Sequence, residues 1–140
     1  MTDEQRTPDY INNRNIPFLP GHLDIEITRI DRDGAEGGFT VGPHHMAPNG
    51  FLHAGSIVSL ADTMCGMACS ASLPDTARGF TTIELKSNFF ATATSGRVHA
   101  TATPVHLGGM TQVWDCEVVH LDTGKRMASF RCTQMVLARR

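Results

Sequence analysis

Apolar and polar residues alternate along the chain from residue 23 to residue 30. Leu23, Ile25 and Ile27 are each followed by a polar residue, which is the pattern of a strand with one buried face. Three glycines between residues 34 and 38 predict a turn into a second strand at 39–41. Four β-like segments follow later, separated by glycine-containing turns typical of hairpins, at residues 80–90, 97–106, 111–121 and 127–138.

The segment at residues 54–71 has a different pattern. It contains no proline and a single charged residue, Asp62, and it consists mainly of apolar and small residues. Because it is longer than a typical strand, we predict a helix that is buried on nearly all sides. Pro74 marks its end.

The predicted order of elements is β-β-α-β-β-β-β, in one domain over residues 1–140. Residues 1–20 are polar and contain three prolines, so we expect an N-terminal arm with one helical turn. Hairpin-linked strands favour an antiparallel sheet with the helix on its face, an α+β fold. Such a sheet covers the helix from one side only, and a second subunit is the simplest cover for the rest. We therefore expect a homodimer.

Composition excludes several functional classes. A net charge of −2 and a pI near 6.4 give no basic surface for nucleic acid. No apolar run reaches the length of a membrane span, and the N-terminus does not resemble a signal or transit peptide. The four cysteines lack Cys-x-x-Cys spacing and are expected to be reduced and buried, which favours a cytoplasmic location.

Asp62 is the most unusual residue of the predicted helix. A carboxylate in apolar surroundings is costly unless it is hydrogen-bonded or used chemically. One interpretation is a structural Asp that accepts hydrogen bonds from neighbouring groups. The other is a desolvated general base or nucleophile with a perturbed pKa.

The residues that precede the helix favour the catalytic interpretation. Small residues, Ala54 and Gly55, leave backbone N–H groups uncovered at the helix start, where a developing oxyanion can bind. Ala54 and Asp62 are eight residues apart, which corresponds to about 12 Å along a helix axis. Since both should approach one carbonyl closely, we expect them to come from different subunits.

Residues 49–71, NGFLHAGSIVSLADTMCGMACSA, resemble a known catalytic segment. They are similar to the His-Gly-Gly-x(6)-(Asp/Glu) segment of hotdog-fold thioesterases, in the branch of the phenylacetate-pathway and Arthrobacter-type 4-hydroxybenzoyl-CoA thioesterases. The similarity continues through ELKSNFFATATSGRVHATA and LGGMTQVWDCEV. It implies an antiparallel sheet wrapped around one long central helix, a homodimer that often forms a dimer of dimers, and hydrolysis of a CoA thioester. CoA would be part of the substrate, so no separate cofactor is expected.

The resemblance also implies roles for individual residues. Asp62 aligns with the catalytic acid, the Ala54 N–H with the oxyanion donor, and His53 with the histidine that supports the loop beside Gly55. Thr82 aligns with a residue near the attacking water. The residues that align with contacts to the CoA nucleotide are Gly109, Met110 and Thr111, and further candidates for its phosphates are Arg97, Lys125, Arg126, Arg139 and Arg140.

The chain departs from the family pattern at several positions. The family commonly has Asn or Gln where this chain has Ala47, and Asn49 is the candidate to replace it. Ala54 stands where the family usually has Gly. Gly66 leaves an opening one turn after Asp62, where the Arthrobacter-type enzyme has Thr. Ala91 replaces a basic residue found in some relatives.

Other residue patterns and functions carry less weight. His44, His45 and His53 lack zinc-ligand spacing, so no metal is expected and the adjacent pair is interpreted as solvated. Met46, Met64 and Met67 either line an acyl pocket or fill the core. The alternatives to a thioesterase are a noncatalytic acyl-CoA-binding module and a hotdog hydratase, whose Asp-x-Asn-Pro-x-His segment does not occur here.

Overall fold

Six antiparallel strands and one long helix form the body of the protein. The computed structural model describes residues 1–139, and the strand order in the sheet is β1-β2-β4-β5-β6-β3. The strands are β1 (Glu26–Asp31), β2 (Gly34–Thr40), β3 (Ala77–Phe89), β4 (Arg97–Leu107), β5 (Thr111–His120) and β6 (Lys125–Ala138). The predicted β-β-α-β-β-β-β order is confirmed.

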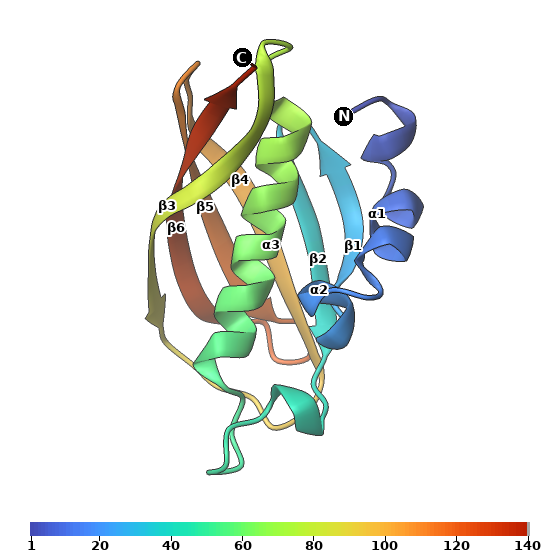
Figure 1. Ribbon diagram of the computed structural model, residues 1–140. Coiled ribbons are helices and arrows are strands. Elements are labelled where there is room, and N and C mark those ends of the chain that lie inside the picture. Colours follow the sequence, from blue (N-terminus) through green and yellow to red (C-terminus); the bar gives the residue numbers. More distant parts are fainter. Residues whose placement is uncertain (140) are drawn as a thin grey trace.

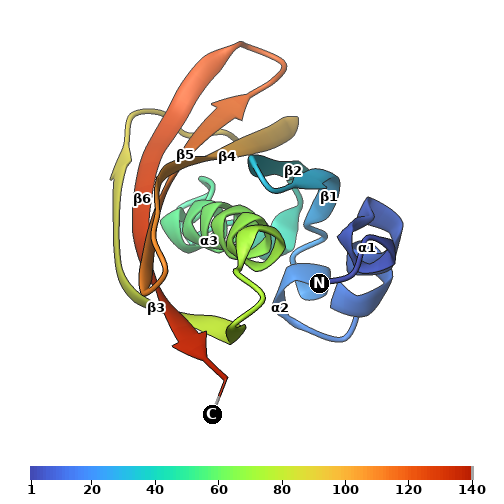
Figure 2. The same cartoon turned by 90° about the horizontal axis from the view of Figure 1, so that it is seen from above.

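The long helix α3 (Ala54–Ser72) lies in the concave side of the curled sheet (Figure 1). Seen from above, the strands curve around α3 and leave one of its flanks uncovered (Figure 2). Its buried positions recur at helical spacing, as in Ile57, Leu60 and Met64, and they pack against inward-facing residues of the strands. The architecture is the sheet-wrapped helix that the resemblance implies. Among residues 1–139, no helix is both long and apolar enough to cross a membrane.

The N-terminal arm contains more helix than predicted, so the expectation of a single turn was wrong. It forms a short 3-10 turn η1 (Glu4–Arg6), α1 (Pro8–Asn15) and α2 (Leu19–His22). Thr7 caps α1 by accepting a hydrogen bond from the Tyr10 N–H, and Pro8 occupies the favoured first position. The Asn12 side chain then bonds both the N–H and the carbonyl of Ile27, at 2.8 and 2.9 Å. Docking on β1 therefore stabilises helices that the local sequence indicates only weakly.

The first two strands also differ from their predicted bounds. Leu23 precedes β1, although the predicted alternation of buried and exposed residues over 23–27 is confirmed. Gly37 and Gly38 do not turn the chain but lie inside β2. A Cβ atom at Gly38 would stand 2.1 Å from the Val98 carbonyl oxygen, so only glycine lets the backbones of β2 and β4 come this close.

Candidate active site

Asp62 lies in the middle of α3, and its side chain is half-buried. Its Oδ1 atom is buried and has no hydrogen-bond partner among the described residues. Burial raises the pKa of this carboxyl group above its ordinary value. Among the described residues, Asp62 therefore lacks the hydrogen bonds that a structural carboxylate would require.

The first turn of α3 leaves one backbone donor unused. His53 is the N-cap, and its Nδ1 atom accepts a hydrogen bond from the Gly55 N–H at 2.7 Å. The Ser56 N–H donates to the His53 carbonyl at 3.0 Å. Within residues 1–139 the Ala54 N–H has no hydrogen-bond partner, and Ala54 is exposed. The donor available at the helix start is therefore that of Ala54, whereas the donor of Gly55 is used by His53.

A buried histidine holds the loop that leads to this helix start. The His45 carbonyl accepts hydrogen bonds from the His53 N–H (2.9 Å) and the Ser56 hydroxyl (2.8 Å). Its ring bonds the Leu23 carbonyl through Nε2 at 2.7 Å and the Gly42 N–H through Nδ1 at 2.9 Å. Because Nδ1 accepts, the proton is on Nε2 and the ring is neutral, and burial lowers its pKa.

The expectation that His44 and His45 are both solvated is therefore wrong for His45. His45 is 0% exposed and stacks on Phe39 at 4.1 Å between ring centroids. His44 keeps an exposed ring beside Asp24. No spacing pattern in the sequence distinguishes the two, because the difference arises from contacts with β2 and with Leu23.

Thr82 and Asn49 both have hydrogen-bond partners within the chain. The Thr82 hydroxyl donates to the buried Gln134 on β6 at 2.8 Å, which leaves the Thr82 oxygen free to accept. Phe80, two residues earlier on β3, packs beside Gly66, which is one turn beyond Asp62. Since β3 and α3 run in opposite directions in Figure 1, Thr82 lies near the level of Asp62. Asn49 is exposed, and its Oδ1 atom accepts a hydrogen bond from the Phe51 N–H at 3.1 Å.

The candidate CoA contacts fall at opposite ends of the molecule. Arg97 begins β4 and pairs with Glu26 at 3.1 Å, near the helix start. Gly109, Met110 and Thr111 follow the other end of β4, roughly 30 Å away. One chain therefore does not bring Arg97 and this turn together. Arg140 lies outside the described residues.

Two thiols on α3 have no catalytic character. Cys65 and Cys69 are 0% exposed, and burial raises the pKa of Cys69 to about 12. The pKa of Cys65 is also raised, by hydrogen bonds with the buried Cys116 and Cys132. All four cysteines are free and buried, as predicted. A thiol that stays protonated is a poor nucleophile.

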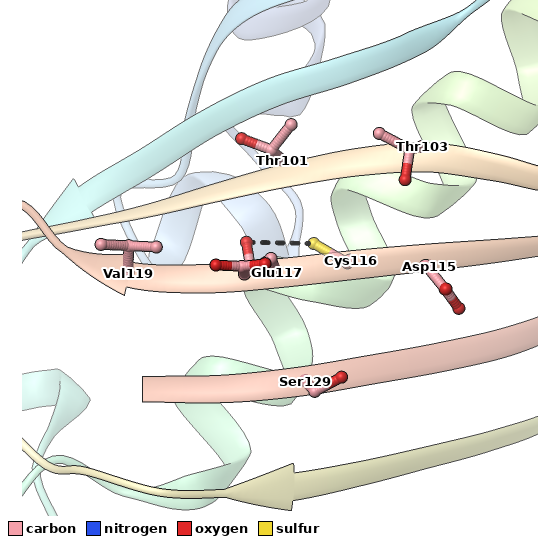
Figure 3. Close-up of a pocket in the computed structure, with 7 residues that line it drawn as sticks. All are labelled: Thr101, Thr103, Asp115, Cys116, Glu117, Val119 and Ser129. Carbon is pink, nitrogen blue, oxygen red and sulfur yellow. Dashed lines mark hydrogen bonds between the residues drawn. The ribbon is translucent and has the colours of Figure 1, made fainter. Parts of the chain in front are cut away.

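The surface hollows do not all belong to this site. A hollow of about 410 Å³ lies on the outer face of β4, β5 and β6, lined by Thr101, Asp115 and Glu117 among others (Figure 3). No residue of α3 lines it. A groove of about 310 Å³ runs instead between the arm and α3, and its lining residues are Met1, Ile11, Arg14, Asn15, Phe18, Met67 and Ser70. Met64, by contrast, is core.

Comparison with known proteins places this geometry in context. The thioesterase superfamily model matches residues 49–127. The chain is 31% identical to the 1,4-dihydroxy-2-naphthoyl-CoA hydrolase of Escherichia coli over 85% of its length and 86% of that protein's. It is 28% identical to the proofreading thioesterase EntH of Cronobacter turicensis, over 94% of both chains. The crystal structure of a Haemophilus influenzae thioesterase superposes with a TM-score of 0.87, at 30% identity, over 94% of this chain and 91% of that one.

Proposed function

Because the chain belongs to the thioesterase superfamily and is a thioester hydrolase with the hotdog fold, we propose that it hydrolyses an acyl-CoA to the free acid and CoA, with Asp62 as the catalytic carboxylate. The observation that carries the proposal is the pair of unsatisfied groups on α3. Within residues 1–139, the buried Asp62 Oδ1 has no hydrogen-bond partner and the exposed Ala54 N–H has no acceptor. A hydrolytic site needs both a free acceptor, which takes the proton of water, and a free donor, which binds the carbonyl oxygen of the substrate.

In the proposed mechanism, the thioester carbonyl oxygen accepts a hydrogen bond from the Ala54 N–H. The positive end of the α3 dipole then stabilises the negative charge that develops on this oxygen. Asp62 takes a proton from water as the water oxygen bonds to the carbonyl carbon. The C–S bond then breaks, and the proton passes to the leaving thiolate. Desolvation raises the basicity of Asp62, which suits it to this task.

A second route would have Asp62 attack the carbonyl carbon directly and form an anhydride that water resolves. Transfer of oxygen-18 from labelled water into Asp62 during a single turnover would identify this route. Thr82 is suited in either case to accept a hydrogen bond from the water, because its own proton is donated to Gln134.

The two catalytic groups on one α3 cannot serve the same carbonyl. The helix is continuous from Ala54 to Ser72, so Ala54 and Asp62 remain about 12 Å apart along its axis. We therefore assign the Ala54 donor of one protomer and the Asp62 of its partner to each active site. His53 and His45 hold the Ala54 donor in place.

Strand β3 supports the same assembly. It is the last strand of the sheet, and its outer backbone edge has no partner among residues 1–139. It also carries exposed large apolar side chains, including Ile83, Leu85 and Phe89. An open edge of this length is normally covered. A second copy that pairs along β3 would cover the edge and close over the flank of α3 that carries Asp62.

The groove between the arm and α3 is the proposed site for the acyl group. Ile11, Phe18 and Met67 give it apolar walls. The buried Asn15 side chain contributes an Nδ2 group with no partner among the described residues, which would donate to an oxygen of the acyl group. These features fit an aromatic or medium-chain acyl group that carries a hydrogen-bond acceptor.

The Ala54→Pro substitution tests the oxyanion donor directly. Ala54 is the first residue of α3, a position where proline fits, and His53 has the extended φ of −68° and ψ of 134° that a residue before proline prefers. The variant therefore removes one N–H and preserves the helix. We expect kcat for phenylacetyl- or benzoyl-CoA to fall by about 10²- to 10³-fold. Ala54→Gly, which keeps the N–H, is the matched control.

Mixed dimers test whether the site is shared. In a purified heterodimer of Ala54→Pro and Asp62→Asn chains, a shared arrangement leaves one of the two sites intact, so activity returns. A site contained within one protomer predicts an inactive heterodimer, and that result would refute the assignment. Tight binding of acyl-CoA without thiol release by the unaltered protein would instead identify a noncatalytic acyl-CoA-binding module.

A further inference from the structure

Three arginines that are far apart in the sequence line one cavity at the end of α3. Arg6 comes from η1, Arg78 from the start of β3, and Arg139 from the segment that follows β6. The cavity has a volume of about 250 Å³. Figure 1 shows the N-terminus and the end of β6 at the same end of α3. Neither Arg6 nor Arg78 belongs to any motif of the sequence.

The charges around this cavity do not cancel. Arg6 pairs with Asp3 at 2.9 Å, and Asp75 also lines the cavity. Arg139 uses its Nε atom to donate to the Ala77 carbonyl at 3.2 Å, and its terminal nitrogens have no side-chain partner among residues 1–139. Arg78 is exposed and has no ion pair in the described part of the chain. Even with both acids counted, the arginines are in excess.

The Arg6 side chain carries a second sign of an unfilled site. It is only 19% exposed, and its Nε atom is buried without a hydrogen-bond partner among residues 1–139. Buried charged donors are normally paired. Guanidinium groups that converge on one space are suited to phosphate and carboxylate, which they can bind with two parallel hydrogen bonds.

The cavity is connected to the proposed active site. Ser70 lines both the cavity and the acyl groove, and it lies eight residues, or about 12 Å, beyond Asp62 on α3. The turn with Gly109, Met110 and Thr111 lies at the same end of α3 as the cavity. Its Met110 carbonyl accepts a hydrogen bond at 2.8 Å from the N–H of Val136, near the end of β6. A molecule whose thioester lies at Asp62 could therefore place an anionic group in the cavity.

We propose that Arg6, Arg78 and Arg139 form a binding site for an anionic group of the thioester substrate. The inference rests on the proposed thioester hydrolysis. Two parts of a substrate supply this chemistry: a phosphate of CoA, or a carboxylate at the far end of the acyl group. Both would bind through charge-assisted hydrogen bonds to the arginines.

The test uses an Arg78→Ala/Arg139→Ala double variant, because both side chains are exposed and their loss spares the half-buried Arg6. Arg32→Ala is the control, since Arg32 is exposed in the β1–β2 turn and lines none of the hollows described above. Each variant is assayed with phenylacetyl-CoA, with the matching phenylacetyl-pantetheine, and with a pantetheine thioester whose acyl group ends in a carboxylate. Direct binding of adenosine 3′,5′-bisphosphate is measured by calorimetry.

A phosphate site predicts that the double variant raises KM for the CoA thioester by about 10-fold per arginine, with no change for phenylacetyl-pantetheine. It also predicts lost binding of the bisphosphate. A carboxylate site predicts the same rise for the carboxylated pantetheine thioester alone. Equal effects on all three thioesters, or no effect on any, would overturn the proposal. If the unaltered protein hydrolyses none of the three, the proposed function fails, while the bisphosphate measurement still tests the cavity for phosphate.

Discussion

Replacing Asp62 by Asn should remove activity and at the same time stabilise the fold. The substitution keeps the shape of the side chain and removes its charge and its basicity. General-base catalysis typically contributes about 10²- to 10⁴-fold, so we expect kcat to fall by that factor. Because Asp62 must be ionised to act, kcat/KM of the unaltered protein should decline as the pH falls through its raised pKa.

The expected gain in stability follows from the unpaired oxygen. A buried polar atom without a partner costs about 1–3 kcal/mol, and more when it is charged. The amide still buries a polar atom, so only part of this cost is relieved, and we expect a gain of about 1 kcal/mol. For a chain of this length, that gain corresponds to a rise in Tm of about 3 °C.

The pH dependence of this gain can be given a sign. The folded pKa of Asp62 lies above its unfolded value of 3.8, so the folded state holds the proton more tightly. The stabilisation from this proton is complete below 3.8 and is lost as the pH rises through the folded pKa. The Tm difference between Asp62→Asn and the unaltered protein should therefore be small in acid and full at neutral pH.

Thermal unfolding at one protein concentration and at several pH values measures this difference. Asp33→Asn, an exposed residue of the β1–β2 turn, is the matched control and should change Tm little at any pH. A lower Tm for Asp62→Asn at neutral pH would mean that the ionised carboxylate has a stabilising partner. That result would refute the catalytic interpretation of the unpaired oxygen.

Three further substitutions test parts of the scaffold. His53→Ala removes the cap that accepts the Gly55 N–H, so unfolding by urea should show a loss of about 1 kcal/mol, together with reduced kcat. His45→Gln should make the free energy of unfolding less dependent on pH on the acid side. Because the pKa of His45 is lowered in the folded state, the stabilisation from its neutral ring is complete above pH 6.5 and is lost as the pH falls toward the folded-state pKa. Urea titrations across this pH range measure the difference. Gly38→Ala places a methyl group against the Val98 carbonyl, so we expect the free energy of unfolding to fall by about 3 kcal/mol or more, or the chain to fail to fold. Circular dichroism measures this, and near-normal stability would show that β2 and β4 can separate easily.

The sequence predicted those features that depend on local pattern. The length of α3, the order of helix and strands along the chain and the burial of Ile25 and Ile27 follow from periodicity, and the structure confirms them. The sequence pattern indicates too little helix in the arm, because Asn12 holds the arm on β1 through a contact between residues fifteen positions apart. The sequence pattern places Gly37 and Gly38 wrongly in a turn, because glycine is ambiguous without knowledge of the neighbouring strand.

Some residues of the candidate site can likewise be predicted from the local sequence, and others depend on contacts that form only in the folded chain. Asp62 and the helix start could be singled out, because one charge in an apolar helix is visible in the sequence. His45 could not, since its importance comes from contacts with Leu23, Gly42 and Phe39 that only the folded chain assembles. The same holds for the arginine cavity, whose members come from both ends of the chain and the start of β3.

The two hydrogen bonds between the Asn12 side chain and the Ile27 backbone have a consequence for how the substrate range of such an enzyme can change. The two walls of the proposed acyl groove belong to different parts of the molecule. One wall is α3, which carries Asp62, and the other is the N-terminal arm, which is bound to β1 through the Asn12 side chain. Changes in the arm can therefore reshape what the groove accepts while the catalytic helix keeps its position. Selectivity and chemistry are in this sense separately adjustable, although they share a single chain of modest size.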